Sequence, residues 1–300
     1  MVRDRGKGTA EVVRDREGTV LRVAPPPGPA GWRAVPGDSA GVAAARPPRA
    51  CSGAGADHLP VNEVSMRIGI LGTGSVGTTL AGALAARGNE VVVGTRDPAG
   101  TMARTEPGPM GNPPFPAWQA EHPEVRLGTF AEAAEHGEVV INASNGAASL
   151  EVLKLAGAEH LEGKILVDVS NPLEFSGGVL SLWVANTDSL AERIQRAFPG
   201  AKVVKTLNTM NAQVMVDPGR VAGGEHHVFV SGDDPQARTR VAGLLRDWFG
   251  WRHVLDLGDL TSARGAEMIL PLWIRVMGSL GTAEFNFRIA TGAAPAADPT

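Results

Sequence analysis

The stretch Ile68-Gly69-Ile70-Leu71-Gly72-Thr73-Gly74-Ser75-Val76-Gly77 decides the fold. It joins a short apolar run to a segment of helical periodicity through a complete G-x-G-x-x-G sequence, which is typical of a phosphate-binding turn between a strand and a helix. In such a turn Gly72 permits the tight bend, Gly74 lets the backbone approach a pyrophosphate, and Gly77 allows the helix to pack on the strand. The first N–H groups of the helix would then face the phosphates. A dinucleotide site is the favoured interpretation, and a glycine turn without a ligand is the alternative.

Short apolar runs alternate with amphipathic segments from Met66 onward, and this alternation predicts βαβ units with a parallel sheet. We expect strands at 67–71, 90–94, 138–142, 164–169 and 201–206, a short strand near 125–127, and helices at 75–87, 147–156 and 189–198. The proline-rich segment Pro98 to Pro123 interrupts this rhythm, so we expect a loop there, beside the carboxyl edge of the sheet. The predicted fold class is α/β, a Rossmann-type doubly wound, mostly parallel sheet.

A smaller α+β unit is expected after this sheet, with strands at 226–231 and 253–257, a helix at 235–249 and one or two helices within 261–290. The predicted domains are therefore an NADP-binding Rossmann domain over residues 66–205 and a C-terminal substrate and dimerisation unit over 206–300. The last helical segment is apolar on nearly all sides, and such a helix needs burial on several faces. A symmetric partner would supply one of them, so we expect a homodimer formed through the C-terminal helices.

Residues 1–65 differ from the rest of the chain in being rich in Ala, Gly, Pro and Arg, without helical or strand periodicity. Such a segment buries too little apolar surface to offset its ordering entropy. Its charged residues leave no apolar stretch for a secretory signal. We expect a disordered N-terminal extension, which could lie upstream of a true start at Met66.

Composition excludes several classes of function. From Met66 onward the chain has 19 basic and 25 acidic residues, a balance that argues against nucleic acid as a partner. The single cysteine is Cys51, so the folded part has no disulfide, no thiolate nucleophile and no cysteine-based metal site, and a reducing cytoplasm is the expected location. The histidines show no ligand spacing, and we expect no metal. No apolar run reaches the roughly 18 residues of a membrane span, and without a tyrosine a Tyr-x-x-x-Lys acid/base pair is impossible.

The choice between NAD and NADP is read at the end of the second strand, where NAD enzymes usually place an acid on the ribose. Here Val91-Val92-Val93-Gly94 continues into Thr95 and Arg96. A hydroxyl followed by a guanidinium suits a 2′-phosphate, which accepts charge-assisted hydrogen bonds from arginine. Asp97 could instead be a ribose-binding acid, but the following proline favours a turn residue. The sequence therefore favours NADP.

Polar residues follow three successive predicted strands, at the edge where open α/β sheets bind ligands. They are Asn142 to Asn145 with Gly146, Asp168 to Pro172, and Lys205 to Asn211. Amides and hydroxyls there can orient a ring without supplying a strong acid, which fits hydride transfer between two bound redox cofactors better than carbonyl reduction. The alternative for Ser170 and Asn171 is that they only cap turns.

With these residues in place, the chain from Met66 to about Ile289 resembles the family of NADPH-dependent coenzyme F420 reductases. The resemblance lies in the glycine turn, in Val91 to Arg96, in Val203-Val204-Lys205-Thr206-Leu207-Asn208-Thr209-Met210, and in Val228-Phe229-Val230-Ser231-Gly232-Asp233-Asp234. It implies that NADP(H) lies over Thr73, Ser75 and Val76 with its 2′-phosphate on Thr95 and Arg96. It also implies that coenzyme F420, a deazaflavin co-substrate, faces the nicotinamide near Asn208, Thr209 and Met210, which we take as the catalytic residues. The remaining predicted cofactor-binding residues are Ala143, Ser144, Asn145 and Asn171.

Three departures from the archaeal members concern the hydride partner and the phosphate corner. Those members carry a histidine where this chain has Asn208 and a lysine where it has Gly100, and their loop equivalent to Pro98–Pro123 is shorter. Arg104 is a candidate to assist Arg96. Two other functions stay open: reduction of another acceptor, such as an imine, a keto acid or a flavin-linked ferric centre, and NADPH binding by a regulatory protein without turnover.

Overall fold

The computed structural model describes residues 12–14, 20–22, 65–108, 111–176 and 179–292. The chain divides into two units, Met1–His58 and Leu59–Thr300. In the first unit the described residues form a hairpin of two antiparallel strands, β1 (Val12–Arg14) and β2 (Val20–Arg22). The expected disorder of residues 1–65 otherwise falls outside the described residues.

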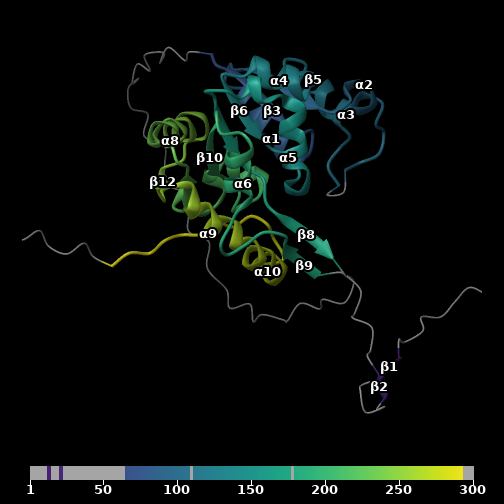
Figure 1. Cartoon of the computed structure of the whole chain (residues 1–300), viewed down its shortest axis with the longest axis vertical. Helices are drawn as coiled ribbons and strands as arrows, with labels where there is room; N and C mark the ends of the chain where they lie inside the picture. The colour runs from purple at the N-terminus through teal and green to yellow at the C-terminus, as the bar shows by residue number, and fades with distance from the viewer. Residues whose placement is uncertain (1–11, 15–19, 23–64, 109–110, 177–178, 293–300) are drawn as a thin grey trace, which may run out of the picture. The chain divides into compact units, whose positions relative to one another are not determined.

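The second unit is built on an eight-stranded sheet of order β12-β11-β10-β7-β6-β3-β4-β5 (Figure 1). Six strands, from β10 to β5, run parallel, whereas β11 pairs antiparallel with β10 and parallel with β12. A separate antiparallel pair, β8 with β9, projects beyond the sheet. The bounds are β3 Arg67–Leu71, β4 Glu90–Thr95, β5 Arg126–Thr129, β6 Val139–Asn142, β7 Ile165–Asp168, β8 Leu173–Ser176, β9 Val179–Leu182, β10 Lys202–Thr206, β11 His227–Ser231 and β12 His253–Asp256.

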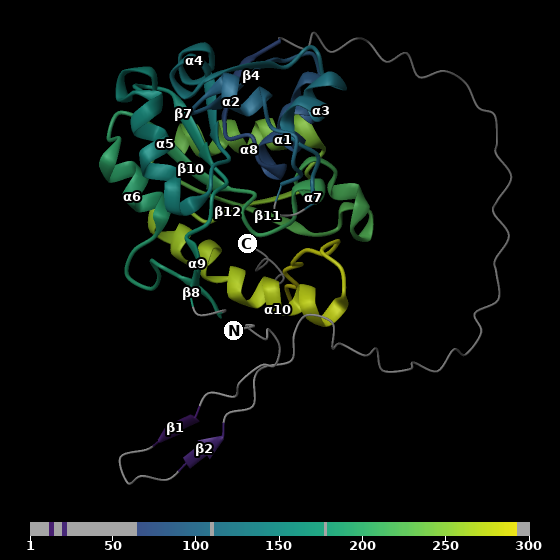
Figure 2. The same cartoon turned by 90° about the vertical axis from the view of Figure 1, so that its right-hand side faces the viewer.

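Helices cover both faces of the sheet (Figures 1 and 2). One apolar core joins the sheet to α1, α3, α7 and α8, and a second core joins its other face to α4, α5, α6 and the start of α9. The bounds are α1 Ser75–Ala85, α2 Pro98–Met102, α3 Phe115–Ala120, α4 Phe130–His136, α5 Ser149–Ala156, α6 Leu190–Ala197, α7 Ala212–Val216, α8 Pro235–Phe249, α9 Ala263–Met268 and α10 Leu270–Leu280. None of the helices in the described ranges has the length and apolar character needed to cross a membrane.

The side chains of β3 show how the sequence places apolar residues on both faces of the sheet. Ile68 and Ile70 face the first core and Leu71 faces the second, because successive side chains of a strand point to opposite faces. Gly69 lies where α4 crosses, and a Cβ there would come within 2.0 Å of the Ala133 carbonyl oxygen. The strand is thus buried on both faces, as parallel strands covered by helices are.

The predicted fold class is confirmed, with a doubly wound, mostly parallel sheet. β11 and β12, which we expected in a C-terminal unit, hydrogen bond into this same sheet, and the division at residue 206 stays a prediction. The loop expected over Pro98–Pro123 contains two short helices, α2 and α3, each with a proline in its first turn, where the missing N–H costs no helical hydrogen bond. The expected final helix ends at Leu280 rather than near Ala290, because Gly281 adopts a left-handed conformation with φ +68°.

Candidate functional site

The glycine turn between β3 and α1 has the geometry of a diphosphate cradle. Gly72 adopts φ +128°, and a Cβ there would lie 2.7 Å from the Ala143 carbonyl oxygen. A Cβ on Gly77 would lie 2.1 Å from the Gly72 carbonyl oxygen, so both positions need glycine for the protein's own packing. Gly74, the N-cap of α1, has nothing within 4 Å of its Cβ position. Open space over the backbone at the start of a helix is what a phosphate group requires.

The end of β4 forms the corner where the 2′-phosphate is expected. The Thr95 hydroxyl is buried and lies 2.9 Å from the Thr101 hydroxyl of α2, whereas Arg96 is exposed. Asp97 caps α2, its carboxylate accepting from the Gly100 N–H at 3.0 Å, so it serves as a turn residue. A Cβ on Gly100 would lie 2.4 Å from that carboxylate, so a larger residue there would require the Asp97 side chain to shift.

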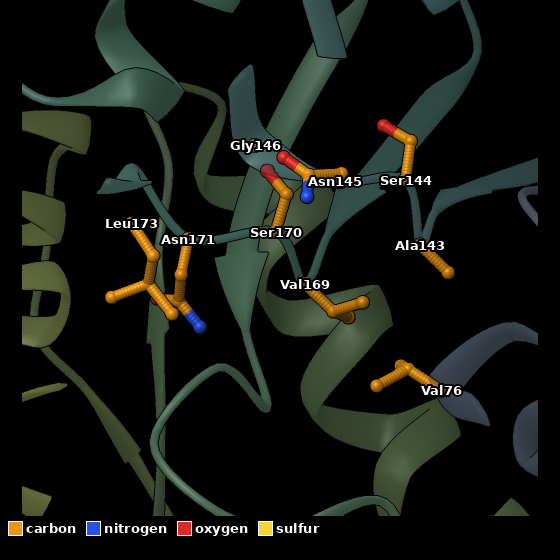
Figure 3. A pocket seen from close by; sticks show the side chains of 9 residues that line it. All are labelled: Val76, Ala143, Ser144, Asn145, Gly146, Val169, Ser170, Asn171 and Leu173. Atoms are coloured by element: carbon orange, nitrogen blue, oxygen red, sulfur yellow. The ribbon is translucent and has the colours of Figure 1, made fainter. Parts of the chain in front are cut away.

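A pocket of about 190 Å³ opens at the carboxyl edge of the sheet, beside the glycine turn (Figure 3). Val76, Ala143 and Val169 form an apolar wall on one side of it. The lining also includes Leu173 and five residues of the loops after β6 and β7, namely Ser144, Asn145, Gly146, Ser170 and Asn171. None of the nine lining side chains ionises near neutral pH, so the pocket can orient a ring by packing and hydrogen bonds but contains no acid or base among them.

Asn142 and Asp168 lie beneath the pocket and hydrogen bond to two of the serines that line it. The Asn142 amide nitrogen donates to the Asp168 carboxylate at 2.9 Å, and its oxygen accepts from the Ser144 hydroxyl at 2.6 Å. The same Asp168 oxygen accepts from the Ser170 hydroxyl at 2.7 Å and from its N–H at 3.2 Å. Both Asn142 and Asp168 are fully buried, so the two pocket hydroxyls are fixed by groups that solvent does not reach.

The three predicted catalytic residues lie behind the pocket rather than on its surface. Asn208, Thr209 and Met210 are 3%, 2% and 6% exposed. Asn208 exchanges hydrogen bonds with Asn171, its amide donating to the Asn171 side-chain oxygen at 2.9 Å and its carbonyl accepting from the Asn171 amide at 3.0 Å. It also donates to the Ala266 carbonyl at 2.9 Å. In this conformation Asn208 therefore positions a residue that lines the pocket.

A buried ion cluster lies next to these groups. The Lys205 ammonium is 2.8 Å from the Asp168 carboxylate and 3.0 Å from the Glu267 carboxylate, and it also donates to the Ser170 carbonyl. Burial lowers the pKa of Lys205, but the two carboxylates outweigh this effect and hold the pKa above its usual value. Glu267 in turn accepts from the Leu190 and Ala191 N–H groups at 2.8 and 3.1 Å, at the start of α6.

The structure brings most of the predicted cofactor residues to one edge. The glycine turn and the helix start are formed by Gly72, Thr73, Gly74, Ser75, Val76 and Gly77. Thr95 ends β4 and Arg96 follows it directly. The pocket is lined, together with Val76, by Ala143, Ser144, Asn145 and Asn171. The Val230–Asp234 segment instead ends at the opposite edge, where Asp234 caps α8 and pairs with Lys202 at 3.0 Å. In the described ranges no group of three or more His, Cys, Asp or Glu residues could hold a metal ion.

Glu267 and Thr101 had no assigned role in the sequence analysis. The signal for Glu267 was a lone acid inside an apolar helical segment, since a buried carboxylate needs a partner. Thr101 gave no such signal, because its contact with Thr95 depends on how the short α2 folds back.

Known proteins are similar to this chain in sequence and in fold. The family model described as "NADP oxidoreductase coenzyme F420-dependent" matches residues 67–172. A proposed F420-dependent NADP reductase from Arthrobacter sp. FB24, known from a crystal structure, is 59% identical with a TM-score of 0.72, and the match covers 76% of this chain and 100% of that one.

Two curated relatives extend the comparison. The F420-dependent NADP reductase of Methanothermobacter marburgensis is 28% identical over 219 residues, which cover 70% of this chain and 92% of the relative. The metalloreductase STEAP3 of Rattus norvegicus is 32% identical over 212 residues, or 69% of this chain, and the match spans only 38% of that longer protein.

Fold, glycine turn and relatives together define an NADP-dependent oxidoreductase. More narrowly, the chain belongs to the family of coenzyme F420-dependent NADP oxidoreductases. Its match to the Arthrobacter protein spans the whole length of that protein.

Proposed function

We propose that the protein transfers hydride between NADP(H) and a deazaflavin coenzyme of the F420 type. In this proposal the diphosphate lies over the Gly72–Gly77 turn, the 2′-phosphate on Thr95 and Arg96, and the nicotinamide in the pocket lined by Ala143, Ser144, Asn145 and Asn171. NADPH, when bound, supplies the hydride, and the deazaflavin accepts it.

The observation that carries the proposal is the absence of an ionisable side chain among the nine residues that line the pocket. A carbonyl reductase must protonate the alkoxide that forms, and it places a general acid within hydrogen-bond reach for that step. Hydride transfer between two conjugated rings has no such requirement, because the protein's task is to position the rings and to shape their surroundings. Reduction of the deazaflavin by NADPH takes up one proton overall, which water at this open edge can supply.

The acceptor side of the pocket is assigned to the loop after β10. Asn208 hydrogen bonds to Asn171, Thr209 and Met210 follow it in the same loop, and Leu173 at the start of β8 completes the lining. The β8–β9 hairpin and α10 lie next to this edge in Figure 2, which gives the acceptor a wall outside the Rossmann sheet. We therefore propose Asn208, Thr209 and Met210 as the residues that shape the hydride partner's site, with Asn208 acting through Asn171.

The test mixes the purified protein with NADPH and oxidised coenzyme F420 and follows the deazaflavin absorbance. Rapid bleaching with NADPH, and slow or no bleaching with NADH, would support the proposal. Tight NADPH binding without turnover of F420, FAD or a ferric chelate would instead favour a regulatory protein.

A ferric centre is the second candidate acceptor, and the relative whose name favours it is the rat metalloreductase, 32% identical over the aligned residues. The same assay with a ferric chelate in place of F420 separates the two. A rate with the ferric chelate that exceeds the rate with F420 would assign the chain to metal reduction.

We also propose a cytoplasmic homodimer. Leu272 and Leu280 of α10 are 54% and 59% exposed, and Phe175 of β8 is 75% exposed. Large apolar side chains exposed on α10 and β8 favour a protein partner, and a second copy of the chain would cover them symmetrically. The absence of cysteine after Cys51 fits a reducing compartment.

A further inference from the structure

Hydrogen-bond stoichiometry fixes the charge of the buried cluster formed by Asp168, Lys205 and Glu267. Lys205 has three donors and three acceptors around it, namely Asp168, Glu267 and the Ser170 carbonyl, so it is an ammonium ion. Asp168 accepts from Asn142, from Ser170 and from Lys205, and no acceptor for a carboxyl proton is among these partners. Only an ionised carboxylate satisfies such a set of donors.

Glu267 is ionised for the same reason. Its two oxygens accept from the Leu190 N–H, the Ala191 N–H and the Lys205 ammonium. The cluster therefore contains two negative charges and one positive charge, with all three side chains at most 2% exposed. The N–H groups at the start of α6 offset part of the excess negative charge, but a helix terminus supplies only about half a unit charge.

The neighbouring charged groups are already paired among themselves. Glu192 of α6 pairs with Arg264 of α9 at 2.6 Å, and Asp188 pairs with Arg193 and Arg196 at 2.9 Å. These pairs are closer to solvent than the cluster, where screening is stronger. They leave the net negative charge of the cluster in place.

The cluster lies directly beneath the pocket. Ser170 lines the pocket, its hydroxyl and N–H bond to Asp168, and its carbonyl bonds to Lys205. Asp168, the negative end of the cluster, is thus separated from the pocket by a single serine. No buried counter-charge other than Lys205 hydrogen bonds to Asp168 among the described residues.

We propose that this cluster makes the pocket prefer the oxidised, cationic nicotinamide of NADP⁺ over the neutral ring of NADPH, and that Glu267 sets the preference. The inference rests on the proposed function in one respect, that the nicotinamide occupies this pocket. Hydride donation turns a neutral ring into a cation, so a buried negative charge beneath the ring favours transfer from NADPH to the acceptor. The cluster then shifts the equilibrium between enzyme-bound NADPH and enzyme-bound NADP⁺ without touching the reacting atoms, and it leaves the equilibrium of the free cofactors unchanged.

The expected size follows from Coulomb's law. A net unit charge at about 10 Å, with an effective dielectric constant of about 20, changes the relative affinity for a cation and its neutral form by roughly tenfold. Because the α6 terminus offsets part of the charge, we expect between about threefold and tenfold.

The test measures the dissociation constants of NADP⁺, NADPH and 2′,5′-ADP by calorimetry for the wild type and three variants. Glu267→Gln removes the excess negative charge, so the affinity for NADP⁺ should fall by about threefold to tenfold relative to the affinity for NADPH. The same fall is expected relative to 2′,5′-ADP, which has no nicotinamide. Glu267→Asp shortens the side chain but keeps its charge, and Glu151→Gln neutralises an exposed acid on α5. Both should keep the wild-type ratio of NADP⁺ to NADPH affinity.

Equal weakening of all three ligands in Glu267→Gln would overturn the inference, because a merely structural role would not distinguish the two oxidation states. A wild type that binds neither NADP⁺ nor NADPH would contradict the proposed function itself, so the two failures are distinguishable. Glu267→Gln could fail to fold, because its amide would oppose an N–H donor. In that case the affinities of the wild type for NADP⁺ and NADPH test the inference. NADP⁺ bound at least as tightly as NADPH supports the inference, and tighter binding of NADPH overturns it.

Discussion

The three glycines of the nucleotide turn have different physical reasons to be glycine. Gly72 and Gly77 are required by the protein, since a side chain at either would meet backbone atoms within 3 Å. Gly74 is required by the ligand, because its Cβ would point into open space that we assign to the diphosphate. A motif read from sequence contains both kinds of requirement, and only the structure separates them.

A matched pair of substitutions tests this separation. Gly74→Ala should lower the free energy of unfolding by less than about 1 kcal/mol, since alanine is only a poorer N-cap. It should lower the affinity for NADPH by roughly tenfold or more, because the diphosphate could no longer approach the backbone closely. Gly77→Ala should cost about 2 kcal/mol or more of stability, because the new methyl group overlaps a carbonyl. Urea unfolding and NADPH titration of each variant measure both effects. Normal NADPH binding by Gly74→Ala would mean that the diphosphate lies elsewhere.

A substitution of Arg96 tests whether the site binds NADP in preference to NAD. A guanidinium that donates to a 2′-phosphate contributes roughly 1.5–3 kcal/mol, so Arg96→Ala should weaken NADPH by about 10- to 100-fold and leave NADH nearly unchanged. Arg246→Ala is the matched control, because Arg246 is also exposed but lies on α8, which packs against β10, β11 and β12. Fluorescence titration with both cofactors decides the point. A similar loss of NADPH and NADH affinity would reject the 2′-phosphate assignment.

At the scale of elements, α6 is held at its first turn by side chains from two directions. Ser189 accepts from the Glu192 N–H at 3.1 Å and its hydroxyl donates to the Glu192 carboxylate at 2.7 Å. Arg264 of α9 binds that carboxylate at 2.6 and 2.9 Å. This clamp joins α6 to α9, the helix that carries Glu267, so it also supports the buried cluster under the pocket.

The clamp predicts a specific pH dependence of stability. The hydrogen bond from Arg264, and to a lesser extent that from Ser189, overcome partial desolvation and lower the pKa of Glu192 below its ordinary 4.5. A carboxyl whose folded pKa is lowered stabilises the protein above its unfolded pKa, and this contribution is lost as the pH falls through the folded pKa. Glu192→Gln should therefore cost about 0.5–1 kcal/mol at pH 7.

Urea unfolding of the wild type and Glu192→Gln across acid pH checks this prediction. The difference between them should shrink as the pH falls below 4.5, the ordinary value for this carboxyl. A difference that stays constant from pH 7 into acid would show that Glu192 contributes by shape and not by charge.

The sequence predicted the elements that have a strong period of their own. The parallel strands and α1, α5, α6 and α8 fall within a few residues of their expected positions, because buried strands and amphipathic helices carry their pattern locally. Helix α4 was not predicted, although Thr129 and Glu132 form a capping box at its start, which is a local signal in the sequence. Strands β8 and β9 were not predicted either, although their two short runs are separated in sequence by Gly177-Gly178, which is a hairpin signal.

At the scale of the whole molecule, the candidate site divides into a local part and a tertiary part. The glycine turn, Thr95 and Arg96 were predictable, because each follows its own strand in sequence and parallel strands end at one edge. The link between Asn208 and Asn171 and the contact of Glu267 with Lys205 were not, because α9 lies about 60 residues beyond β10 and its position depends on the packing of α6. The electrostatic character of the pocket therefore depends on the part of the fold that local patterns do not specify.

The apolar surface of α10 carries the last prediction, which concerns assembly. A stable dimer buries about 1,600 Å² in total and excludes unpaired charges from its centre, so Leu272→Asp should dissociate the proposed dimer. Leu155→Asp is the matched control, since Leu155 is 43% exposed on α5, away from α10. Light scattering coupled to size exclusion should show a dimer for the wild type and Leu155→Asp and a monomer for Leu272→Asp. A monomeric wild type, or dissociation by Leu155→Asp instead, would remove α10 as the interface. Because α10 lies beside the β8–β9 hairpin, an intact pocket in the monomeric variant would also show that each chain completes the proposed nicotinamide pocket alone.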